Sequence, residues 1–95
     1  MPGYNRAELT AELKVLASSD SERAPQEQIE AAREAAGDSG LAREAGPETT
    51  ALAGERSEVL EAMLKVIEAS LDAGAHAVQV NVETEGDSPR FDGGD

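Results

Sequence analysis

The stretch SEVLEAMLKVIEASLDAGAHAVQVNVET, residues 57–84, decides the fold because its apolar period changes from helical to extended within one segment. Its first part repeats large apolar side chains every three or four positions, at Val59, Leu60, Met63, Leu64, Ile67 and Leu71. This spacing predicts an amphipathic helix over residues 57–73, with Ser57 as N-cap and Gly74 after its end. Further on, valine alternates with polar residues, which predicts a strand over residues 77–84.

The preceding residues repeat this order of elements. Residues 8–18, ELTAELKVLAS, place apolar side chains at alternate positions and predict a half-buried strand. Pro25 suits the first turn of a helix over residues 25–36, which Gly37 would end. A weak strand over residues 40–45 and a Gly46-Pro47 turn then lead to a third strand over residues 48–53. In that strand, alternation places Thr50 and Leu52 on one face.

The order strand, helix, strand, strand, helix, strand predicts an α+β, ferredoxin-like βαββαβ sandwich. We expect one four-stranded antiparallel sheet with both helices on one face, because right-handed crossovers leave few alternatives. The single domain would span residues 1–85, followed by a disordered acidic tail over residues 86–95. The predicted core consists of Leu13, Val15, Ile29, Leu52, Leu60, Met63, Leu64, Ile67, Val78 and Val80.

Composition narrows the class of protein. The 95 residues carry a formal net charge of -12 and no cysteine, which argues against nucleic acid as a partner and excludes disulfides and thiolate chemistry. With no signal-like or membrane-spanning run of apolar residues, we expect a cytoplasmic protein without a membrane partner. The acidic surface suits a salt-rich, halophilic cytoplasm, and an acidic protein from a GC-rich genome is an equal alternative.

Self-association is expected because the core is aliphatic and light, with Tyr4 and Phe91 as the only aromatic residues. The sheet face opposite the helices would be semi-polar, with Thr10, Glu12, Lys14, Leu16, Thr49, Ala51, Gln79 and Asn81. Such a face could pair with another copy, so the sequence predicts a homodimer or homotetramer.

Three segments together resemble the thiamine-binding protein family: GPETTALAGE at residues 46–55, EVLEA at 58–62 and AGAHAV at 73–78. That family has a Gly-Pro, a Ser or Thr shortly after it, an apolar strand ending in Gly plus an acid, an amphipathic helix, and an Ala-Gly-Ala entry to the last strand. The resemblance spans Glu8 to Val82. It implies a ferredoxin-like oligomeric domain that binds thiamine or its hydroxymethylpyrimidine part, without catalysis.

The resemblance implies that Thr50 supplies the ligand-binding hydroxyl, and that Thr49 and Glu48 lie at the entry to the same strand. A buried hydroxyl needs a partner, which a pyrimidine could provide. A carboxylate at Glu48 could offset the positive thiazolium of thiamine. The alternatives are that Thr50 is an ordinary strand residue whose hydroxyl bonds nearby backbone, and that Glu48 is a solvated surface acid.

Other chemistry has little support in the sequence. His76 is the only histidine and has no second ligand at metal-binding spacing, so no metal site and no cofactor beyond the ligand is expected. Arg23 follows the first strand, as the catalytic arginine of acylphosphatases does, but the glycine-rich pattern of that family is absent. Two alternatives to small-molecule binding remain, a regulatory module that binds ligand between paired domains and a structural oligomerisation module.

Overall fold

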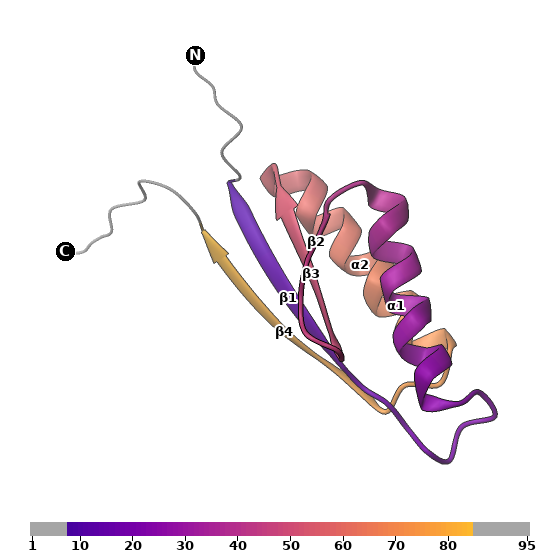
Figure 1. Cartoon of the computed structure of the whole chain (residues 1–95). Helices are drawn as coiled ribbons and strands as arrows, with labels where there is room; N and C mark the ends of the chain where they lie inside the picture. The colour runs from indigo at the N-terminus through magenta and orange to yellow at the C-terminus, as the bar shows by residue number, and fades with distance from the viewer. Residues whose placement is uncertain (1–7, 85–95) are drawn as a thin grey trace.

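Six elements follow one another in the computed structural model, which describes residues 8–84 (Figure 1). They are β1 (Leu9–Leu16), α1 (Pro25–Ser39), β2 (Ala42–Arg43), β3 (Thr49–Gly54), α2 (Arg56–Asp72) and β4 (Ala77–Thr84). The strands form one antiparallel sheet in the order β2-β3-β1-β4, and both helices lie on the same face of it. The α+β ferredoxin-like prediction is therefore confirmed. The predicted acidic tail lies outside the described residues.

The register assigns each strand residue to a face. Leu13 of β1 lies opposite Thr50 of β3 and Val80 of β4, and directly opposed residues of antiparallel strands point to the same side. Because Leu13 is buried beneath the helices, Thr50 also faces them, as the alternation predicted. Thr49 pairs with Lys14 and belongs to the opposite, outer face.

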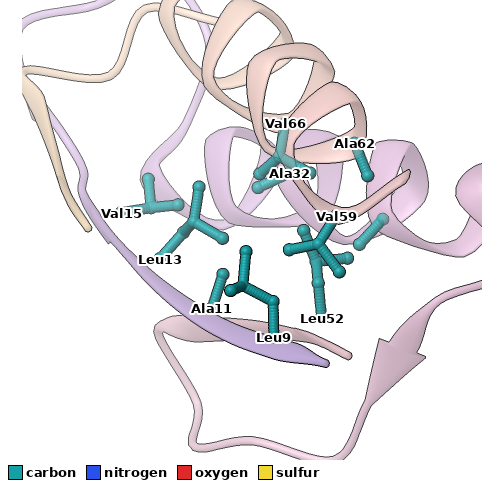
Figure 2. Packing of buried hydrophobic residues seen from close by; sticks show 10 residues of the cluster. Leu9, Ala11, Leu13, Val15, Ala32, Leu52, Val59, Ala62 and Val66 are labelled. Atoms are coloured by element: carbon teal, nitrogen blue, oxygen red, sulfur yellow. The ribbon is translucent and has the colours of Figure 1, made fainter. Parts of the chain in front are cut away.

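The core is built from small and medium-sized aliphatic side chains between the sheet and the helices (Figure 2). It contains Leu9, Ala11, Leu13, Val15, Ala32, Ala36, Leu52, Val59, Ala62 and Val66. The alanines of α1 allow that helix to pack closely. Neither helix of the described range is long and apolar enough to cross a membrane.

Three predicted core residues are wrong, because Leu60, Leu64 and Val80 are 45%, 58% and 40% exposed. The remaining predicted residues are buried or pack against the core. On α2 the positions directed at the sheet are Val59, Ala62 and Val66. An α-helix advances about 100° per residue, so Leu60 and Leu64 lie about 100° and about 140° around the helix axis from Val59. The helical period was right, but the largest side chains do not mark the buried side.

The first helix is longer than predicted, since α1 continues to Ser39 and includes Gly37. The left-handed cap is Gly40, with φ of 78°, and the Ser39 hydroxyl donates to the carbonyl oxygen of Ala36 at 2.6 Å. A glycine inside a helix is tolerated at a cost of about 1 kcal/mol. The following strand is correspondingly shorter, Ala42–Arg43 in place of residues 40–45.

The start of α2 is capped from another element. Ser57 is not its N-cap; Glu55 occupies that position and makes no side-chain cap bond. Instead, the backbone N–H of Arg56 donates to Oε1 of Glu8, which precedes β1, at 2.8 Å. A carboxylate at a helix N-terminus satisfies a free N–H group and interacts favourably with the helix dipole.

Glu8→Ala should therefore lower the free energy of unfolding by about 0.5–1 kcal/mol, since it removes this cap. Glu12→Ala is the matched control, because it removes a carboxylate from the outer face of the same β1 strand. Urea denaturation of both variants measures the difference. Equal losses would show that the carboxylate of Glu8 does not act as a cap.

Candidate functional site

A hollow of about 370 Å³ lies where α1, the segment after β2 and the start of β3 meet. Its lining residues are Arg33, Ala36, Ala42, Arg43, Glu44, Ala45, Thr49 and Thr50. Two of the three residues predicted from the sequence to bind ligand, Thr49 and Thr50, therefore lie beside the same hollow. They project from opposite faces of β3, close to where the sheet ends at the two-residue strand β2.

Thr50 is the buried polar group of this hollow, with a relative exposure of 5%. Its hydroxyl forms no hydrogen bond to another residue within 8–84. Buried hydroxyl groups in proteins are nearly always hydrogen-bonded, because leaving one unpaired costs about 1–3 kcal/mol. The side chain is thus available to a molecule that enters the hollow.

Arg33 shapes the hollow from the α1 side. Its Nη2 donates to the carbonyl oxygen of Gly46 at 3.1 Å and to that of Pro47. The turn is also closed internally, because the N–H of Thr49 donates to the Gly46 oxygen at 3.2 Å. Arg33 therefore holds the Gly46-Pro47 turn against α1 and sets the position at which β3 begins.

The charge of the hollow differs from that of the whole chain. Arg33 and Arg43 both line it, against one carboxylate, Glu44. Within residues 8–84 neither arginine forms an ion pair. The register places Arg43 opposite Ala51 on the outer face, so Arg33 is the arginine on the same side of the sheet as the buried hydroxyl. A guanidinium group there favours a ligand that combines a hydrogen-bonding ring with an anionic group.

The third predicted ligand residue, Glu48, is exposed and does not line the hollow. Its backbone carbonyl accepts a hydrogen bond from the N–H of Val15 at 3.0 Å, which extends the β1–β3 pairing. His76 is also exposed, and its backbone N–H donates to the Leu16 oxygen at 2.8 Å. Among the described residues, no three His, Asp or Glu side chains gather where they could hold a metal ion.

The loop after β1 is organised around Gln28, which is fully buried. Its Oε1 accepts from the N–H of Ser18 at 2.8 Å, while its Nε2 donates to the oxygens of Ser18 and Arg23 at 2.8 and 2.9 Å. The Arg23 side chain pairs with Glu27 on the surface at 3.5 Å. In this loop the polar groups of Gln28 and Arg23 therefore stabilise the fold.

Sequence reasoning missed both Arg33 and Gln28. Their partners are backbone carbonyl and amide groups of distant residues, which leave no pattern in side-chain identity. Arg33 is one of several singly placed arginines, and Gln28 stands among other polar helix formers. The sequence holds one indication for Gln28. It lies four residues before Ala32, and therefore on the side of the helix that was predicted to be apolar.

No protein-family model matches the chain, and no curated protein is significantly similar to it. Solved structures that share its fold include the following two. A domain of unknown function, DUF77, from Bacillus cereus superposes with a TM-score of 0.64 at 22% identity, covering 90% of this chain and 82% of that one. A Thermotoga maritima protein named for a proposed part in thiamine biosynthesis or salvage superposes with a TM-score of 0.66 at 23% identity, covering 82% and 84%. At this level of identity the likeness shows the fold.

Proposed function

We propose that the protein is a non-enzymatic binding protein for a small pyrimidine-containing molecule of the thiamine or hydroxymethylpyrimidine class. The observation that carries the proposal is the Thr50 hydroxyl, which is buried, forms no bond to another described residue and lines a hollow large enough for such a ring. The name of the Thermotoga maritima protein with the same fold supports this ligand class.

The charges beside Thr50 refine the ligand. An aminopyrimidine offers ring nitrogens and an amino group to a threonine hydroxyl, which can donate or accept. Arg33 and Arg43 would oppose the positive thiazolium of thiamine but attract a phosphate. The phosphate esters of hydroxymethylpyrimidine or thiamine therefore fit this hollow better than thiamine itself, with Glu44 close enough to moderate the positive charge.

Thr50→Val tests the site, because valine keeps the shape and strand preference but removes the hydroxyl. One net hydrogen bond of about 0.5–1.5 kcal/mol corresponds to a loss of affinity of roughly 2- to 12-fold. Calorimetry should compare thiamine, thiamine phosphates, hydroxymethylpyrimidine, its phosphate and free amino acids. Thr84→Val, at the exposed end of β4, is the matched control and should bind as the wild type does.

Three results would contradict the proposal in different ways. Equal affinities of the wild type and Thr50→Val would remove Thr50 from the site. Binding of amino acids alone would favour the regulatory module. Absence of binding by every compound would leave a structural oligomerisation module, for which the apolar surface of α2 and β4 is the favouring observation.

A further inference from the structure

The guanidinium group of Arg33 holds the Gly46-Pro47 turn through one of its three nitrogens. Nη2 donates to the carbonyl oxygen of Gly46 at 3.1 Å and to that of Pro47, so both of its hydrogens are used. The N–H groups on Nε and Nη1 form no hydrogen bond to another residue within 8–84. Arg33 therefore keeps donors for a further partner, in addition to those that hold the turn.

The nitrogen that holds the turn is also the one that an anion needs. A guanidinium group binds phosphate or carboxylate through two parallel N–H bonds, either from Nη1 and Nη2 or from Nε and Nη2. Each of these pairs includes one hydrogen of Nη2, and both hydrogens of that nitrogen are bonded to carbonyl oxygens of the turn. A bidentate anion can therefore bind Arg33 only if the guanidinium group gives up one of the two carbonyls.

The surroundings of Arg33 favour this exchange of partners. Arg33 lines the hollow beside Thr50 and forms no ion pair with another residue within 8–84, although the chain has a net charge of -12. A phosphate oxygen carries negative charge and a carbonyl oxygen does not, so at equal distance the guanidinium group attracts the phosphate more strongly. A ligand shifts a conformational equilibrium only by binding one state better, and the bidentate contact supplies that difference.

We propose that Arg33 couples the binding of an anionic ligand in the hollow to the release of the Gly46-Pro47 turn from α1. The proposal rests on the proposed function, because it takes the ligand to be a phosphate ester of the pyrimidine. With the ring beside Thr50, the phosphate of the same molecule binds Arg33 through two N–H groups and displaces one turn carbonyl. The unphosphorylated pyrimidine lacks this group and leaves the turn in place.

Other bonds limit the movement to a short segment. On one side of the turn, β2 ends at Arg43, which is paired with β3. On the other side, the carbonyl oxygen of Glu48 accepts a hydrogen bond from the N–H of Val15 in β1 at 3.0 Å. Residues 44–47 lie between these two points and are all exposed. Because the first two of them line the hollow, release of the turn moves one wall of the site.

Hydrogen exchange at Thr49 reports on the turn. The N–H of Thr49 donates to the Gly46 oxygen at 3.2 Å, and this oxygen also accepts from Arg33. Without Arg33 the turn depends on a single bond at the surface, so it should open more often. By NMR of the full chain, saturating hydroxymethylpyrimidine phosphate should speed exchange of this N–H by about 5-fold or more, and hydroxymethylpyrimidine by less than about 2-fold. The N–H of Val15 is the internal reference and should keep its rate.

Arg33→Gln removes the guanidinium group that holds the turn. Glutamine is a good helix former and position 33 is exposed, so the variant should remain folded. Its Thr49 N–H should exchange about 5-fold faster than that of the wild type even without ligand, and the phosphate ester should add less than about 2-fold. Arg23→Gln is the matched control, because it removes the same charge from the loop after β1, away from the hollow. It should respond to the phosphate ester as the wild type does.

Inorganic phosphate is a second probe, which does not depend on the pyrimidine. It should speed exchange of the Thr49 N–H in the wild type and in Thr50→Val alike, because the displacement requires Arg33 and not the threonine hydroxyl. Arg33→Gln should not respond to it. Potassium chloride at the same ionic strength is the control for screening of surface charges, and it should leave the rate of the wild type unchanged.

The coupling and the proposed function fail on different results. Unchanged or slower exchange of the Thr49 N–H with both phosphate compounds would overturn the coupling, and the proposed function would stand if calorimetry still showed binding of the ester. Faster exchange with inorganic phosphate, in a protein that binds no pyrimidine, would support the coupling and remove the proposed ligand. Equal responses of the wild type and Arg33→Gln would show that Arg33 does not couple binding to the turn.

Discussion

Gly74→Ala is expected to lower the free energy of unfolding by about 2–4 kcal/mol. Gly74 follows α2 with φ of 102°, where a side chain is strained. A Cβ placed there would stand 1.9 Å from the Ser21 hydroxyl oxygen and 2.8 Å from its Cβ. The loop after β1 would have to move, and the hydrogen bond from the Ser21 hydroxyl to the Ala73 oxygen, 3.4 Å, would break.

Gly37→Ala is the matched control and should change stability in the opposite direction. Gly37 lies inside α1, and a Cβ added to it meets nothing within 4 Å. Alanine there should raise the free energy of unfolding by about 0.5–1 kcal/mol, because it reduces the entropy of the unfolded chain and favours the helix. Urea denaturation of both variants measures the two effects. If Gly74→Ala were as stable as the wild type, the tight contact with Ser21 would be refuted.

Gln28→Met should also destabilise strongly, with an expected loss of about 2–4 kcal/mol. Methionine matches the length of glutamine and leaves no large cavity, so the effect isolates the three hydrogen bonds of the amide. The N–H and oxygen of Ser18 and the oxygen of Arg23 would lose their partner in a partly buried loop.

Gln26→Met provides the comparison, since Gln26 is two residues away on the same helix and its amide bonds Glu30 at the surface, at 3.3 Å. Its free energy of unfolding should stay within about 0.5 kcal/mol of the wild type. Hydrogen exchange adds a local readout: Gln28→Met should speed exchange of the Ser18 N–H far more than exchange in β4. Similar stability of the two variants would mean that the buried amide is dispensable.

The sequence predicted the elements where one period runs without interruption. In β1, alternate apolar residues all point to the buried side, and the bounds predicted for β4 are those observed. The period was less informative in α2, because apolar residues cover both the flank toward the core and the flank beside β4. Side-chain size favours Leu64, whereas geometry buries Ala62 and Val66. Side-chain size alone therefore does not indicate which of the two flanks is buried.

The candidate site was predictable only in part. The alternation in β3 placed Thr50 under the helices, and the resemblance directed attention to it. Arg33 could not be found in the same way, because it reaches the Gly46-Pro47 turn through carbonyl oxygens that every residue has. Glu48 illustrates the opposite case: its identity suggested chemistry, whereas in the structure its backbone extends the sheet.

The central position of β1 also bears on the order in which the sheet can be completed. One side of β1 pairs with β3 and the other with β4, so Leu9 lies opposite both Gly54 and Thr84. During synthesis β1 therefore cannot be paired on both sides until β4 has been made. Half of the backbone groups of β1 stay unpaired until residue 84 has left the ribosome. Pairing β1 with β4 closes a loop that contains all the other elements, and this is slow compared with forming local helices. In the nascent chain, α1 and α2 can form before β1 is paired on both sides.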